Sequence, residues 1–173
     1  RAHTQWNTVY ESYYETTNDQ RVRWTRTNLQ GDAAIGCCGR VPFYPQAKYA
    51  DPAAAIRLAS GREMRLIEAE ARLRADDWQG AIERINAIRL AAGAPAVTAA
   101  NATEAWTHLK RERGIELWLE GRRMGDMRRW RQANTPGEHH PLEIPSAVSH
   151  LTQQDLCFPT PLSERETNPN IPV

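Results

Sequence analysis

The sequence predicts a mainly α-helical protein, and three observations support this. Residues 60–131 carry apolar side chains at helical spacing. Ser60 and Glu63 form a capping-box pattern where the first of these helices would begin. Gly93 and Pro95 would end the second, as a glycine followed by a proline commonly does. The expected fold is a tetratricopeptide-like helical hairpin plus further helices, with a loop-rich N-terminal segment and an extended proline-rich tail.

The 173 residues are expected to form one domain with three segments. Residues 1–59 are a loop-rich segment, because they are aromatic and polar and show no sustained apolar period. Residues 60–131 are the helical core, and residues 132–173 are an irregular segment and tail. Within the first segment, β-branched and aromatic residues alternate with arginine at residues 22–27, which predicts a strand there.

The first two helices are expected to form an antiparallel hairpin, the unit of tetratricopeptide-like repeats. The first runs from Ser60 to about Ala75 and has two apolar faces, so we expect other helices on both sides of it. Asp76 or Asp77 caps the second, whose apolar stripe covers residues 78–92. The two faces of the first helix carry Met64, Ile67 and Ala71, and Leu66, Ala69 and Leu73.

Two more helices are expected after the hairpin. The third covers about residues 103–119 and the fourth about residues 122–131, with Gly121 between them. Four prolines follow in residues 157–173, so we expect that tail to be extended across the surface of the domain.

A row of glutamates lies on the third predicted helix. Glu112, Glu116 and Glu120 are spaced four residues apart on a face that should point inward, so each needs a cation. Arginines close in the sequence can provide these cations in an internal ion network. The alternative is a metal or acid/base site, but no histidine lies at metal-binding spacing. The expected members of the network are Glu112, Arg113, Glu116, Glu120, Arg123, Asp126 and Arg129.

The charge pattern argues against a nucleic-acid partner. The net charge is +1, which gives no overall attraction to nucleic acid or anionic lipid. The basic helix at residues 122–131 contains Asp126, so paired arginines explain it better than a nucleic-acid site does. Neither a Walker loop nor a GxSxG, CxxC or HExxH motif occurs, and Ser163 with Glu166 reads as a helix cap. We therefore expect neither catalysis nor a cofactor or metal.

The three cysteines are Cys37, Cys38 and Cys157. Adjacent cysteines pair with each other only under strain, so one hypothesis is a disulfide from Cys37, or from its neighbour, to Cys157 in an oxidising compartment. Three free thiols, or an incomplete metal site, are the alternatives. The chain opens on a polar segment in which no signal peptide is visible, and we expect it to begin inside a longer precursor or a processed chain.

Four segments together resemble the SusD/RagB family of outer-membrane nutrient-binding lipoproteins. Residues 62–71 read REMRLIEAEA, like the family's R-hydrophobic-A-E-A helix, and residues 81–93 read AIERINAIRLAAG, like its second helix. Residues 112–130 and 159–169 match the long C-terminal signature and the closing proline-rich segment. Upstream landmarks of the family are also similar to residues 18–23 and to Lys48 with Tyr49.

This resemblance implies a non-catalytic protein that captures an oligosaccharide or a peptide beside a TonB-dependent porin at the outer membrane. Family members are several hundred residues long, so the chain resembles their C-terminal portion. Their ligand-contacting aromatics vary, which leaves Trp6 and Trp24 as exposed candidates for ligand binding. The alternative function is an extrinsic scaffold subunit on the periplasmic side of a larger membrane complex, such as a photosynthetic or respiratory assembly.

Overall fold

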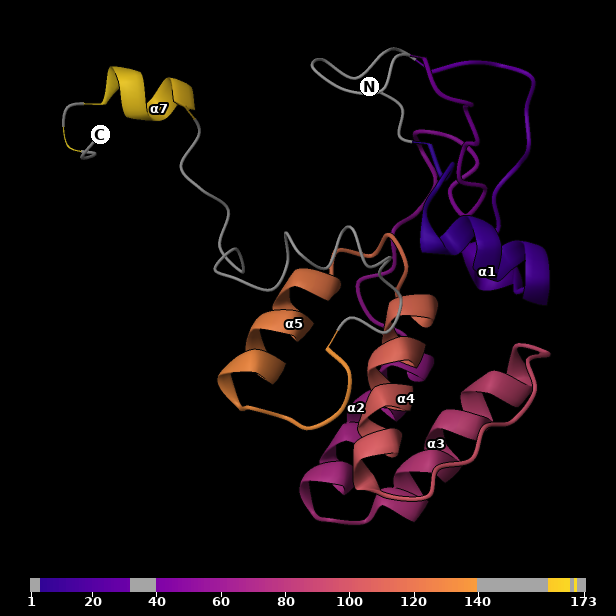
Figure 1. The fold of residues 1–173 in the computed structure, drawn as a ribbon, viewed down its shortest axis with the longest axis vertical. Coiled ribbons are helices and arrows are strands. Elements are labelled where there is room, and N and C mark those ends of the chain that lie inside the picture. Colours follow the sequence, from indigo (N-terminus) through magenta and orange to yellow (C-terminus); the bar gives the residue numbers. More distant parts are fainter. Residues whose placement is uncertain (1–3, 32–39, 140–161, 169, 171–173) are drawn as a thin grey trace. The chain divides into compact units, whose positions relative to one another are not determined.

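The computed structural model describes residues 4–31, 40–139, 162–168 and 170 (Figure 1). It divides into two compact units, Arg1–Glu143 and Ile144–Val173. The described residues form helices and turns, and their only extended pairings are isolated bridges. The mainly α-helical fold is therefore confirmed, whereas the assignment of the whole chain to one domain stays a prediction.

The larger unit contains most of the described helices. The helices expected between residues 60 and 131 all form close to their predicted bounds, whereas α1 was not predicted. The smaller unit contributes the described helix α7, at Leu162–Thr167. The elements of the larger unit are α1 (Val9–Thr17), the 3-10 turn η1 (Gln20–Val22), α2 (Gly61–Arg74), α3 (Trp78–Ala91), α4 (Ala102–Glu116) and α5 (Arg123–Gln132).

The helix starts follow the capping signals in the sequence. The Ser60 side chain accepts a hydrogen bond from the backbone N–H of Glu63 at 3.1 Å, which fixes the first turn of α2. At α3 the cap is Asp77, whose carboxylate accepts from the N–H of Gly80 at 2.9 Å. The Glu63 carboxylate accepts from Arg122 Nε at 3.1 Å, so the same turn also holds the chain just before α5.

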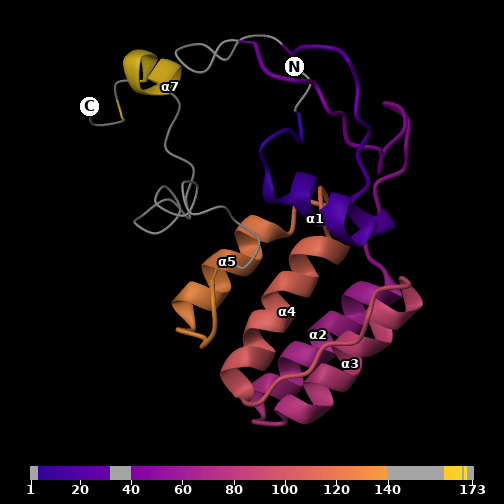
Figure 2. The ribbon, with the colours of Figure 1, turned by 45° about the vertical axis from the view of Figure 1, so that its right-hand side comes forward.

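Helices α2, α3 and α4 pack against one another and lie side by side in Figures 1 and 2. Their facing sides hold the main apolar core, and Trp130 of α5 joins it. Burying this surface is the main force that holds the helices together, because none of them is long enough to be stable alone. The core residues are Leu66, Ala69 and Leu73 of α2, Ala81, Ile82, Ile85 and Ile88 of α3, and Ala105, Trp106 and Leu109 of α4.

Only one of the two apolar faces of α2 is buried. Leu66 is fully buried against α3 and α4, whereas Met64 and Ile67 are each 48% exposed. The expectation that α2 is enclosed on both sides is therefore wrong for the described part of the chain. Helices α3 and α4 both pack on the side of Leu66, and Met64 and Ile67 remain about half exposed to solvent.

A second, smaller core joins the N-terminal segment to the end of α4. Tyr13 of α1 and Val22 of η1 pack against Ile115 and Trp118, and all four are buried. The ring of Tyr10 lies 5.4 Å from that of Trp118. Helix α1 therefore forms where its aromatic side chains can cover the C-terminal end of α4.

The strand predicted at residues 22–27 does not form as a regular strand. Trp24 makes only an isolated bridge with Gln46, although Ala47 N–H donates to the carbonyl of Arg23 at 2.8 Å and Thr25 N–H to that of Pro45 at 3.0 Å. Prolines lack the N–H group that a continuous ladder needs. Because Pro45 lies in the partner run, the pairing stays irregular.

The described part of the tail is helical rather than extended. In α7, the Thr167 hydroxyl donates to the carbonyl of Ser163 at 2.7 Å, and the N–H of Asn168 donates to that of Glu164 at 2.9 Å. Ser163 thus lies inside the helix and is not its cap, contrary to expectation. Pro159 and Pro161 precede Leu162 in the sequence and Pro169 follows Thr167, so no proline lies within the helix, where it would obstruct the backbone hydrogen bonds.

We expect Leu109→Ala to lower the free energy of unfolding by about 2–5 kcal/mol, because Leu109 is fully buried between α2 and α3. Leu90→Ala removes the same atoms from a side chain that is 63% exposed, and should change stability by about 0.5 kcal/mol or less. Urea denaturation of both variants measures the difference. Equal losses would contradict the placement of this core.

Candidate functional site

The carboxylate of Glu112, 1% exposed, is held by arginines from two distant parts of the chain. Arg21 Nη1 lies 2.5 Å from its Oε1, and Arg89 Nη1 lies 2.8 Å from its Oε2. Arg21 is fixed in turn by Asp19, whose carboxylate lies 2.7 Å from Arg21 Nη2. Burial alone would lower the pKa of Arg21, but the carboxylates of Asp19 and Glu112 raise it above its ordinary value.

Glu116, one turn further along α4, shares the same arginine. Its Oε2 lies 3.1 Å from Arg21 Nη1, and its Oε1 lies 3.6 Å from Arg62 Nη1. Beyond the end of α4, Glu120 pairs with Lys48 at 2.7 Å. The glutamate row thus meets four cations, each from a different element or loop.

These contacts form a set that we call the central ion network, in which the Lys48–Glu120 pair is joined to the rest by the hydrogen bond from Lys48 Nζ to the backbone carbonyl of Glu116 at 3.4 Å. It holds equal numbers of positive and negative groups, so each carboxylate is compensated within it. Buried carboxylates that are compensated in this way are poor ligands for a metal and poor general bases. Its cations are Arg21, Lys48, Arg62 and Arg89, and its carboxylates are Asp19, Glu112, Glu116 and Glu120.

A second cluster links α2, α4 and α5. Arg113 of α4 binds Asp126 of α5 through two hydrogen bonds, from Nε at 2.6 Å and from Nη2 at 2.9 Å. Arg129 contacts the same carboxylate at 2.9 Å and also pairs with Glu70 of α2. Trp130 Nε1 donates to Glu70 at 3.3 Å. Burial would raise the pKa of Glu70, but Arg129 lowers it below its ordinary value.

The partners of the glutamate row differ from those expected. Arginines near the row were expected to pair with it, yet its cations come from other parts of the chain. Of the expected members, Arg113, Asp126 and Arg129 belong to the second cluster, and Arg123 lies half-buried at the start of α5. The sequence signal that points to Arg21 is the similarity of residues 18–23 to an upstream landmark of the SusD/RagB family.

Of the two aromatic candidates for ligand binding, only Trp6 is exposed. Trp24 is 6% exposed and stacks on Tyr44 with ring centroids 5.0 Å apart. The guanidinium of Arg26 lies over both rings, at 5.6 and 5.1 Å. Trp6 is 37% exposed. The expected exposure of Trp24 is therefore wrong, and ligand binding at Trp6 stays a prediction.

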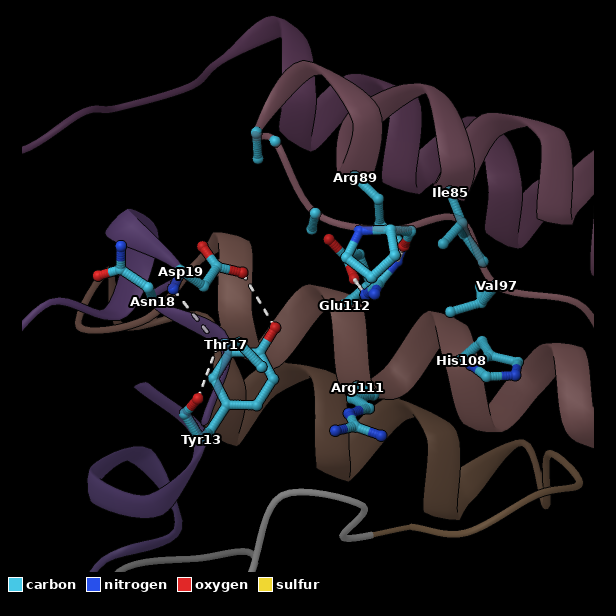
Figure 3. A pocket seen from close by; sticks show the side chains of 14 residues that line it. Tyr13, Thr17, Asn18, Asp19, Ile85, Arg89, Val97, His108, Arg111 and Glu112 are labelled. Atoms are coloured by element: carbon cyan, nitrogen blue, oxygen red, sulfur yellow. Dashed lines mark hydrogen bonds and ion pairs between the residues drawn. The ribbon is translucent and has the colours of Figure 1, made fainter. Parts of the chain in front are cut away.

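A pocket of about 140 Å³ lies between α1, α3 and α4 (Figure 3). Tyr13, Asp19, Arg89, His108 and Glu112 are among the residues that line it. Burial lowers the pKa of His108, which favours a neutral imidazole. Pockets that enclose drug-sized ligands measure about 300–1,000 Å³. This one can therefore hold a small group but not an oligosaccharide.

Metal and membrane sites were searched among the described residues only. No group of three or more His, Cys, Asp or Glu side chains there could hold a metal ion. Within the same residues, no helix is both long and apolar enough to cross a membrane. Cys37 and Cys157, the expected disulfide pair, lie outside the described residues together with Cys38.

Comparison with known proteins identifies the relatives of the chain. The model of the SusD family matches residues 5–171. The chain belongs to the SusD family. A solved SusD-like protein from Bacteroides fragilis is 30% identical, with a TM-score of 0.43, and the match covers 52% of this chain and 20% of that one. A search of curated proteins finds no match.

The resemblance read from the four sequence segments is thus confirmed, and this SusD-family chain spans about a fifth of the solved relative.

One further buried cation, Lys110, lies apart from the central ion network and from the second cluster. Lys110, 1% exposed, donates from Nζ to the carbonyl of Pro136 at 2.7 Å and lies 5.9 and 5.8 Å from the rings of Trp106 and Trp130. Burial lowers its pKa to about 8, although Glu70 partly opposes the shift.

We expect Lys110 to contribute a rise in the stability of this SusD-family chain between about pH 8 and pH 10.5. Over that range the unfolded chain keeps a proton on Lys110 that the folded protein has lost, so the free energy of unfolding increases with pH, by on the order of 1–3 kcal/mol. Urea denaturation across the range measures this increase. Lys110→Met should remove most of it, and an unchanged pH slope in that variant would contradict the assignment.

Proposed function

We propose that this chain is the C-terminal part of a non-catalytic SusD-family protein that binds an oligosaccharide or a peptide at the outer-membrane surface, with a TonB-dependent porin as its partner. The observation that carries the proposal is the family match over residues 5–171. The chain spans about a fifth of the solved SusD-like relative, so ligand and partner are proposed for the whole protein.

The buried carboxylates support a binding role over a catalytic one. A hydrolase that uses two carboxylates needs one of them as an acid or a nucleophile near the substrate. Glu112 and Glu116 instead face arginines on both carboxylate oxygens, and their side chains are at most 2% exposed. We infer that their role is to fix the N-terminal segment against α4.

The exposed apolar residues favour a second candidate function. Ile56 is 70% and Leu58 88% exposed, and the exposed Met64 and Ile67 lie close to them in the sequence. Contiguous patches of exposed apolar side chains are typical of protein-contact surfaces, and we propose that these four residues contribute to one. An extrinsic scaffold subunit on the periplasmic side of a larger membrane complex would use it for that purpose.

Affinity purification of the native protein from gently solubilised membranes distinguishes the two functions. We expect a TonB-dependent porin to copurify, and calorimetry of the purified protein to detect at least one neutral oligosaccharide or peptide. Copurification with other membrane-embedded chains, without any nutrient binding, would overturn this proposal in favour of the scaffold. A Glu116→Gln variant should bind as well as the parent protein wherever it remains folded.

A further inference from the structure

An open hollow of about 430 Å³ lies beside the central ion network. Its size falls within the range of pockets that hold small ligands. Positive charge dominates its lining, which contains a single carboxylate. The charged residues that line it are Arg21, Arg23, Lys48, Arg57, Arg62 and Glu116.

The inner part of the hollow belongs to the central ion network. Glu116 lies between Arg21 at 3.1 Å and Arg62 at 3.6 Å, and its backbone carbonyl accepts from Lys48 Nζ at 3.4 Å. This network holds four cations and four carboxylates, so these three cations are already compensated. They give the hollow a fixed polar wall but little net charge.

The excess charge comes from Arg23 and Arg57 at the rim. Both are exposed, and among the described residues no carboxylate lies within ion-pair distance of either. Their backbones are nevertheless held in place. The carbonyl of Arg23 accepts from the N–H of Ala47 at 2.8 Å, and next to Arg57 the carbonyl of Leu58 accepts from Arg122 at 2.5 Å. Two uncompensated guanidinium groups thus border one hollow.

We propose that this hollow binds an oxyanion, namely a carboxylate, sulfate or phosphate group of a small ligand, with Arg23 and Arg57 as its binding residues. A guanidinium offers paired N–H donors that match the oxygens of such groups. Arg62 is a third donor, because its side chain is 41% exposed and its contact with Glu116 is long. Concave walls lined by one sign of charge also concentrate anions locally.

The oxyanion has two sources that share this chemistry: the acid group of a saccharide, or a free inorganic anion. Neutral saccharides offer no charge to the rim arginines, so the hollow should discriminate against them. This inference goes beyond the proposed function, because it concerns charge recognition and does not require a porin partner or a neutral nutrient.

Calorimetry on the full-length protein at low ionic strength tests the proposal with three probes: trigalacturonate, sodium sulfate and the neutral maltotriose. We expect trigalacturonate to bind, and Arg23→Gln/Arg57→Gln to weaken it by about tenfold or more. The matched control is Arg65→Gln/Arg128→Gln, which removes the same charge from exposed positions outside the hollow and should retain binding. The melting temperatures of both double variants should equal that of the parent.

The set of probes that bind decides whether the proposal holds. If sulfate also binds and competes with trigalacturonate, the site recognises a compact oxyanion; if only trigalacturonate binds, it recognises the acid group of a saccharide. If neither probe binds, or if both double variants lose affinity equally, the proposal is overturned. Binding of maltotriose alone would also overturn it, while leaving the proposed nutrient-binding function intact.

Discussion

The ion pair between Arg21 and Glu112 is the constraint on which the rest of the larger unit depends. It joins residues 91 positions apart and connects the N-terminal segment to the helical core. Both side chains are buried, so removing one partner would leave an uncompensated charge, at a cost of about 3–5 kcal/mol. Arg89 of α3 binds the other oxygen of Glu112, and through that contact three parts of the chain meet at one carboxylate.

The sequence predicted those elements whose signals are local. The Ser60 cap, the apolar stripe of α3 and the glycine after it are read within a few residues, and all three occur. The partners of the glutamate row could not be predicted in this way, because spacing on α4 shows only that cations are needed. Helix α1 was missed for a similar reason, since the core that buries Tyr13 includes Ile115 and Trp118, which lie about a hundred residues away in the sequence.

The inner wall and the rim of the hollow beside Glu116 both result from the central ion network. Compensation of its buried charges requires Arg21, Lys48 and Arg62 to converge there, and this convergence places Arg23 and Arg57 at the edge of a polar cavity. A structural ion network and a proposed anion-binding rim therefore adjoin one another, and Arg62 belongs to both. Of the proposed ligand contacts, Arg23 and Arg62 lie in segments that resemble the SusD family, whereas Arg57 lies outside those segments and outside the network.

A double-mutant cycle on Arg21 and Glu112 tests the central claim most directly. Arg21→Met, Glu112→Gln and the double variant would be unfolded in urea beside the same cycle on Arg26 and Glu15, an ion pair whose side chains are 60% and 44% exposed. The account predicts a coupling energy of about 1.5 kcal/mol or more for the buried pair and below about 1 kcal/mol for the exposed one. Equal coupling energies for the two pairs would contradict it.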